Sequence, residues 1–165
     1  MTDSVDRLVR PMIRGLEPYV PIEPPEILAK REGIHPDQVI KMDANENPYG
    51  ASPKVAEALG AFTGYSIYPD PFQRDIRAAL AAYTGYSADR IIAGSGADEL
   101  IELVVRLTMD SGDQALDLTP TFGMYSVTME MYGIEVVEVP RDEDFGVDVE
   151  AIQLAISPRT KLLFL

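Results

Sequence analysis

The chain has 165 residues, of which 46% are hydrophobic, and it carries a formal net charge of −13. This size and composition predict an ordinary folded domain, and the acidic balance argues against nucleic acid and anionic membranes as partners, since both attract clustered Lys and Arg. Without cysteine and with the single histidine His35, the chain offers no disulfide, no thiol nucleophile and no multi-histidine metal centre. It also lacks a signal peptide's apolar core and the run of roughly 18 apolar residues that spans a bilayer, so we expect a cytoplasmic protein.

The first part of the chain, residues 1–51, is expected to precede the main domain. Residues 1–25 are rich in proline and contain isolated apolar anchors, a pattern typical of an extended arm that lies across another surface. Proline and glycine signals predict a short helix over 25–32, and a short apolar run predicts a strand over 39–42. The polar loop 43–50 follows.

Residues 52–165 alternate between helical and strand-like patterns. In chain order we expect helices over 52–62 and 72–83, a strand over 90–93, a helix over 97–109, a strand over 114–118, a helix over 122–132, a strand over 134–139, a helix over 148–156 and a strand over 161–165. This alternation predicts an α/β fold with a mostly parallel sheet covered by helices on both faces.

The chain ends inside the apolar strand 161–165, with no turn or polar tail after it. Ligands of open α/β sheets bind at the carboxyl ends of the strands, so the chain stops where a site is expected to begin. We therefore expect the N-terminal part of a longer protein, with an incomplete sheet.

A glycine turn, Gly-Ser-Gly-Ala-Asp-Glu at 94–99, joins a predicted strand to a predicted helix. Glycines let a ligand approach the backbone, and the first turn of a helix offers unpaired N–H groups, so the segment suits a phosphate. Alternatively, Ser95 and Asp98 form a helix cap that satisfies the same N–H groups. No Lys-Ser or Lys-Thr follows the second glycine, and Glu99 and Leu100 stand where a third glycine is needed, so neither a Walker loop nor a dinucleotide fingerprint is present.

Four motifs resemble those of the histidinol-phosphate aminotransferase family in order and spacing. They lie at 43–48, 68–70, 94–99 and 120–125. The resemblance extends from about Val9 to the end of the chain and implies a fold-type I, class I/II enzyme dependent on pyridoxal 5′-phosphate. It implies amino transfer between glutamate and imidazole acetol phosphate in histidine biosynthesis, on small phosphorylated keto or amino substrates. It also implies that residues 52–165 are the N-terminal part of the large, cofactor-binding domain, and that 1–51 are an arm and small-domain segment.

The resemblance assigns roles to individual cofactor-binding residues. It places the backbone of Gly96, Ala97 and Asp98 at the cofactor phosphate, and the ring of Phe122 against the pyridine face of the cofactor. Tyr68 matches a tyrosine that reaches the cofactor phosphate of the other subunit, which implies a homodimer for the full-length protein. The alternative for Tyr68 is a simple turn that caps the next helix.

The loop around residues 43–50 borders the substrate pocket in the same family, which implicates Asn47 and Tyr49 in substrate binding. An Asx-rich loop without such a role is the alternative. Threonine-phosphate decarboxylases and aromatic aminotransferases share much of this N-terminal pattern, so they remain rival functions. A rival of another class is a non-catalytic module that binds a phosphorylated ligand or pairs with a full-length subunit.

Transamination needs a lysine that binds the cofactor covalently and transfers a proton. The lysines of this chain are Lys30, Lys41, Lys54 and Lys161. None of them follows the family's serine-rich lysine motif. We therefore expect no catalytic residue and no activity in this chain alone.

Overall fold

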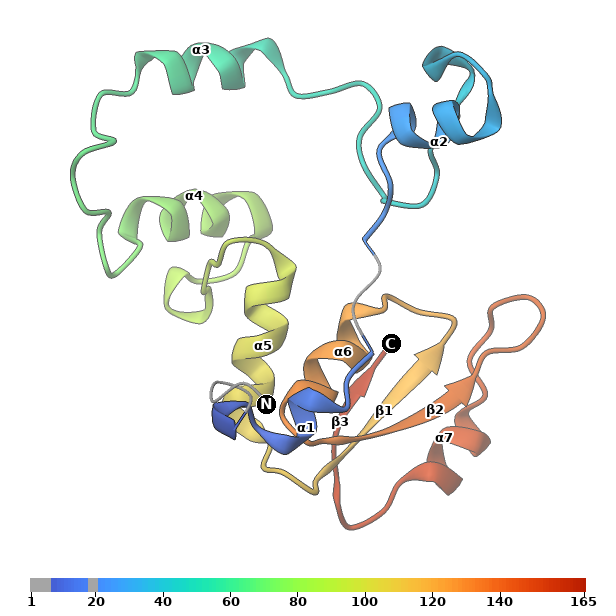
Figure 1. The fold of residues 1–165 in the computed structure, drawn as a ribbon. Coiled ribbons are helices and arrows are strands. Elements are labelled where there is room, and N and C mark those ends of the chain that lie inside the picture. Colours follow the sequence, from blue (N-terminus) through green and yellow to red (C-terminus); the bar gives the residue numbers. More distant parts are fainter. Residues whose placement is uncertain (1–6, 18–20) are drawn as a thin grey trace. The chain divides into compact units, whose positions relative to one another are not determined.

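The computed structural model describes residues 7–17 and 21–165, and the chain divides into two compact units. Residues 19–72 form one unit, here called the helical segment, and residues 1–18 with 73–165 form the other, here called the sheet unit (Figure 1). The domain boundary expected after residue 51 is not tested by this division and stays a prediction.

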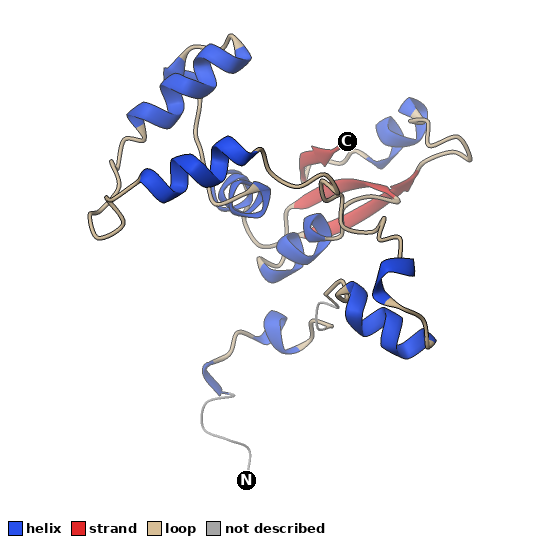
Figure 2. Ribbon diagram, turned by 90° about the horizontal axis from the view of Figure 1, so that it is seen from above, coloured by secondary structure: helices blue, strands red, loops and turns tan. Residues whose placement is uncertain are grey.

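The sheet unit is built from helices that alternate with three strands. Its elements are α1 (Pro11–Arg14), α4 (Arg74–Thr84), η3 (Ala88–Arg90), α5 (Ala97–Thr108), β1 (Gln114–Thr119), α6 (Met124–Met131), β2 (Glu135–Pro140), α7 (Val149–Ala155) and β3 (Thr160–Phe164). All strand pairs are parallel, and the order β2-β1-β3 places β1 in the centre (Figure 2). The predicted parallel sheet is therefore confirmed, with these strand and helix positions within one or two residues of those expected.

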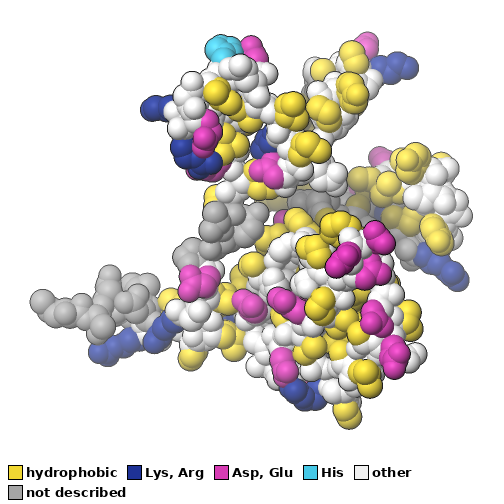
Figure 3. Space-filling model, turned by 90° about the vertical axis from the view of Figure 1, so that its right-hand side faces the viewer, with side chains coloured by type: hydrophobic (Ala, Val, Ile, Leu, Met, Phe, Trp, Pro, Cys, Tyr) yellow, Lys and Arg dark blue, Asp and Glu magenta, His cyan; other side chains and the backbone are white. Residues whose placement is uncertain are grey.

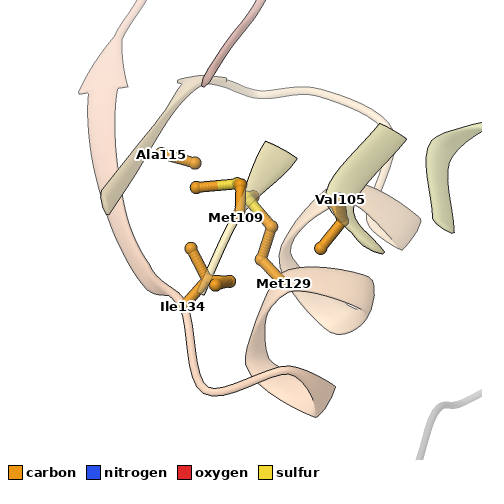
Figure 4. Packing of buried hydrophobic residues seen from close by; sticks show 5 residues of the cluster. All are labelled: Val105, Met109, Ala115, Met129 and Ile134. Carbon is orange, nitrogen blue, oxygen red and sulfur yellow. The ribbon is translucent and has the colours of Figure 1, made fainter. Parts of the chain in front are cut away.

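One face of the sheet is covered by α5 and α6. Their side chains meet those of β1 and of the residue before β2 in a buried cluster (Figure 4). The cluster consists of Val105, Met109, Ala115, Met129 and Ile134. Because successive residues of a strand point to opposite faces, Ala115 contributes to this cluster while its neighbour in β1 faces the other way.

The opposite face of the sheet is covered by α7. Here Leu116 and Leu118 of β1 pack with Val139 of β2 and Ile152 of α7. Burying a leucine side chain of this kind stabilises a fold by about 1.5–3 kcal/mol. Helices on both faces were predicted, and the two buried clusters confirm this arrangement.

Two predicted strands are wrong. Residues 39–42 pair with no strand of the described chain, and neither do residues 90–93, where Arg90 ends η3 and Ile91 is merely extended, with φ −115° and ψ 132°. A short apolar run becomes a strand only where another strand supplies its hydrogen bonds, and the sequence of the run does not reveal that partner.

The helical segment contains α2 (Pro25–Glu32), η2 (Pro36–Gln38) and α3 (Pro53–Ala61). The bounds predicted for α2 are confirmed, because proline opens it and Gly33 closes it in the left-handed conformation at φ 68°. Of the residues described in this segment, Ala29 alone is buried. Figure 3 shows one face of the molecule, on which hydrophobic side chains are exposed beside charged ones.

The described part of the predicted arm, residues 7–17, contains the short helix α1 and is therefore not fully extended. Arg10 donates a hydrogen bond of 3.0 Å to the carbonyl of Met131 and lies 5.7 Å from the ring centroid of Tyr132. This part does lie across another element, the end of α6. Residues 1–6 and 18–20 of the predicted arm lie outside the described residues. In the ranges that are described, no helix combines the length and apolar character that crossing a bilayer requires.

Candidate functional site

The glycine turn of the sequence forms the entry to α5. Gly96 is the N-cap residue and has φ 94° and ψ −179°, a conformation open essentially to glycine alone. The N–H groups in the first turn of a helix have no partner within the helix, and no side chain in the described part of the chain caps them. These donors and the positive end of the helix dipole form a site that suits an anion.

The alternative of a helix cap made by Ser95 and Asp98 is wrong. The helix starts after Gly96, one residue later than that cap requires, and Gly96 has no side chain to accept a hydrogen bond. The backbone N–H of Ser95 instead donates to a carboxylate oxygen of Glu99. The side chain of Glu99 thus turns back over the loop that precedes its own helix.

Gly94 is enclosed by this arrangement. A Cβ atom at Gly94 lies 2.9 Å from Oε2 of Glu99 and 3.1 Å from Cδ2 of Leu100, which is closer than such atoms normally approach. A side chain at position 94 would therefore push the Glu99 carboxylate and Leu100 aside, whereas position 96 needs glycine for its backbone conformation.

The segment that leads into the turn is held by a side chain of α4's N-cap residue. Gln73 donates from Nε2 to the carbonyl of Ala93 at 2.8 Å and accepts from the N–H of Ala93 at 3.1 Å. A surface hollow beside the turn is lined by Gln73, Ile76, Ala93, Gly94, Ser95 and Glu99. The sequence analysis missed Gln73, because nothing in the local pattern signals a contact 20 residues away.

Phe122 follows the carboxyl end of β1, the edge at which parallel sheets bind ligands. Phe122 is 48% exposed, and its ring meets Tyr125 edge to face, with 5.6 Å between centroids. Tyr125 in turn stacks on Phe164 at 4.2 Å. The aromatic contact holds the ring of Phe122 on one side and leaves part of it accessible to a ligand.

Asp117 is a second residue that the sequence analysis missed. It lies in the centre of β1, only 2% exposed, and its Oδ1 has no hydrogen-bond partner among the described residues. Burial raises the pKa of the Asp117 carboxyl, and the nearby Glu138 carboxylate raises it further. The sequence does carry a signal for this residue, because Asp117 is a charged residue between two leucines of an apolar run.

The predicted substrate residues lie in the helical segment. Asn47 accepts from the N–H of Tyr49 at 3.1 Å and donates to the carbonyl of Gly50 at 2.8 Å, which is an Asx turn. The side chain of Tyr49 is exposed. The turn expected from the residue types is thus confirmed, and the role in substrate binding stays a prediction.

Tyr68 also lies in the helical segment and is 98% exposed. It lines a shallow hollow with Tyr65, Ser66, Ile67 and Pro69. The turn expected here is present, since Asp70 accepts from the N–H of Phe72 at 3.1 Å. The N-cap residue of the next helix, however, is Gln73 and not a member of this turn.

Two of the lysines are engaged in ion pairs. Lys161 lies 2.6 Å from Oδ2 of Asp113, and Lys41 lies 3.1 Å from Oε2 of Glu46. The hydrogen bond with Asp113 raises the pKa of Lys161. A nucleophilic lysine needs the opposite shift, because only its neutral amine attacks a carbonyl.

Comparisons with known proteins identify the family of this chain. The model of the family "Aminotransferase class I and II" matches residues 37–165. A histidinol-phosphate aminotransferase of Roseiflexus castenholzii is 48% identical over the whole chain, and a chloroplastic one of Nicotiana tabacum is 47% identical over 97% of it. The chain spans 46% and 39% of the lengths of these two relatives.

Solved structures give the same result. The histidinol-phosphate aminotransferase of Sinorhizobium meliloti, solved in complex with pyridoxal-5′-phosphate, matches 89% of this chain and 38% of its own with a TM-score of 0.70 and 28% identity. An aspartate aminotransferase variant of Thermus thermophilus matches 94% of this chain and 43% of its own with a TM-score of 0.75 and 22% identity, which supports the fold. The chain belongs to the class I and II aminotransferase family and has the fold-type I architecture.

Proposed function

We propose that this chain is the cofactor-holding part of a pyridoxal 5′-phosphate-dependent aminotransferase that moves an amino group between glutamate and imidazole acetol phosphate in histidine biosynthesis. The observation that carries the proposal is the entry to α5, where a glycine-only conformation precedes uncapped N–H donors. Relatives at 48% and 47% identity that are named histidinol-phosphate aminotransferases support the substrate.

The residues at the entry to α5 fit the phosphate of this cofactor. We assign the N–H groups of Gly96, Ala97 and Asp98 to the phosphate oxygens, because they are donors at the positive end of a helix dipole. Phe122 would pack against the ring, with Tyr125 keeping it oriented from the side. When bound, the cofactor supplies an electron sink for the proton transfers at the substrate carbon.

Residues of the helical segment have roles in the same proposal. The exposed hydroxyl of Tyr68 would reach the cofactor phosphate of a second subunit, so the proposal includes a homodimer. Asn47 shapes the turn that carries Tyr49, and we assign both residues to the border of the substrate pocket.

None of the assigned groups transfers a proton. They hold the phosphate and orient the ring, which aligns the reacting bond for a lysine that this chain does not supply. The proposal therefore includes that the 165-residue chain binds without turning over.

The test uses the full-length protein together with the 165-residue chain. We expect the full-length protein to form 2-oxoglutarate and histidinol phosphate from glutamate and imidazole acetol phosphate, and the short chain to form neither. Phenylpyruvate and threonine phosphate serve as control substrates. Preferred turnover of phenylpyruvate, or release of carbon dioxide from threonine phosphate, would replace the proposed substrate, and turnover by the short chain would overturn its assignment as inactive.

A further inference from the structure

One side chain of α4 and the side chain of its N-cap residue hold the segment that precedes the proposed phosphate site. Arg77 donates from Nε to the carbonyl of Ala88 at 2.8 Å, and Gln73 forms its two hydrogen bonds with Ala93. Arg77 lies in the first turn of α4, and Gln73 is the N-cap residue immediately before that helix. The segment from 88 to 93 is therefore attached to α4 at both ends.

Gln73 replaces the strand neighbour that this segment lacks. A β-ladder residue donates one hydrogen bond and accepts another, and the side-chain amide of Gln73 offers the same pair to Ala93. The amide is partly buried, so water competes less for these bonds. Gln73 does this from a left-handed conformation at φ 53°, which is unfavourable for a residue other than glycine.

The attachment point lies immediately before the turn. Ala93 precedes Gly94, and the next fixed point is Ser95, whose N–H donates to Glu99. Fixing Ala93 and Ser95 leaves Gly94 little freedom, and the direction in which α5 begins follows from it. The position of the N–H donors at Gly96 therefore depends on the side chain of Gln73.

We propose that Gln73 is a positioning residue for the phosphate site: its amide fixes Ala93 so that the N–H groups at the start of α5 converge on the cofactor phosphate. This inference rests on the proposed function. It assigns a role in phosphate affinity to a residue that touches neither cofactor nor substrate.

The test compares two ligands that differ only in the phosphate. The full-length apoprotein is titrated with pyridoxal 5′-phosphate and with pyridoxal, and binding is followed by absorbance. The variants are Gln73→Met, which keeps the shape and removes both hydrogen bonds, and Gln73→Gly, which removes them while relieving the left-handed backbone. Gln153→Met on the exposed side of α7 is the matched control.

We expect both Gln73 variants to bind pyridoxal 5′-phosphate on the order of tenfold more weakly, as the loss of two hydrogen bonds predicts, and to bind pyridoxal as the wild type does. Faster hydrogen exchange at the N–H of Ala93 should accompany the loss. The control variant should match the wild type in all three measurements.

The outcomes separate the two proposals. A wild-type protein that prefers the phosphorylated ligand, together with Gln73 variants that keep this preference, overturns the inference alone. Equal weakening of both ligands also overturns it, because that result reports general destabilisation. A wild-type protein that binds both ligands equally overturns the proposed function together with the inference.

Discussion

The sheet unit and the helical segment differ in how their residues are held. In the sheet unit, β1 is buried from both sides, by α5 and α6 on one face and by α7 on the other. In the described part of the helical segment, Ala29 is the one buried residue, and α3 has none. The proposed phosphate site thus belongs to a unit with its own core, whereas Tyr68 and the Asn47 turn belong to a segment held mainly by local hydrogen bonds.

This difference separates two kinds of site residue. Groups that must hold an anion in a fixed geometry gain from a rigid scaffold, because their order does not have to be created on binding. Residues that we propose to contact a second subunit or a substrate can be carried by a segment whose order depends on what it contacts. The predictions below test whether the two parts of the chain really differ in this way.

The largest difference is expected for the removal of a leucine from each part. Leu116→Ala opens a cavity in the sheet core, where the side chain is 1% exposed, and should lower the free energy of unfolding by about 2–5 kcal/mol. Leu59→Ala, at a position 57% exposed in α3, should change it by less than about 0.5 kcal/mol. Hydrogen exchange of the β1 amides measures the first change, and hydrogen exchange of the α3 amides measures the second. If both substitutions lower the free energy of unfolding by a similar amount, the sheet unit and the helical segment do not differ in how their residues are held.

A smaller effect is expected from the loop that enters α5. Gly96→Ala forces a side chain into a glycine-only conformation and should destabilise the loop by about 1–3 kcal/mol. Gly123→Ala is the control, since Gly123 has the ordinary φ of −59° and open space at its Cβ position. Exchange of the Ser95 amide, which donates to Glu99, reports the loop directly. If Gly96→Ala leaves this exchange unchanged, the loop is not rigid as described.

Asp117 tests whether the core of the sheet excludes water from a buried carboxyl. Its folded pKa is raised, so the folded protein holds the proton more tightly than the unfolded chain, and stability falls as the pH rises through the raised pKa. Asp117→Asn removes this loss. The variant should therefore gain stability relative to the wild type as the pH rises from below the ordinary pKa of an Asp carboxyl to above the raised pKa of Asp117.

Asp113 provides the opposite control. Hydrogen bonds from the N–H of Asp110 and from Lys161 lower its pKa, so its contribution is present at neutral pH and is lost as the pH falls. Asp113→Asn should therefore lose stability relative to the wild type as the pH rises, which is the reverse of Asp117→Asn. Urea unfolding at a series of pH values gives the free energy of unfolding of each variant relative to the wild type. If this difference changes with pH in the same direction for both variants, the pKa of Asp117 is not raised by folding.

The smallest effect is expected in α3. Gly60→Ala adds a better helix former where its Cβ meets nothing, which should stabilise the helix by about 0.5–1 kcal/mol. Circular dichroism should show more helix, while the exchange of the β1 amides should not change. Slower exchange in β1 would mean that the two parts unfold together.

The sequence analysis succeeded where the signal was local. Pro25 and Gly33 give the two ends of α2, and the alternation from residue 97 onward gives a parallel sheet with helices on both faces. It failed at residues 39–42 and 90–93, because an apolar run does not say whether a strand lies beside it.

The same limit applies to the candidate site. The glycine turn was recognised from its residues, but its helix cap was misplaced by one position, and that position decides whether Ser95 can cap the helix. Gln73 went unnoticed because its contact with Ala93 depends on how α4 is placed, which no neighbouring residue signals.

The hydrogen bond from Ser95 to Glu99 has a consequence for the entropy of ligand binding. A loop that waits for a phosphate to order it loses conformational freedom at the moment of binding, and the affinity falls accordingly. Here the carboxylate of the protein itself holds the loop, so this freedom is lost during folding. Phosphate binding should then show a small heat-capacity change and little entropic penalty from the loop.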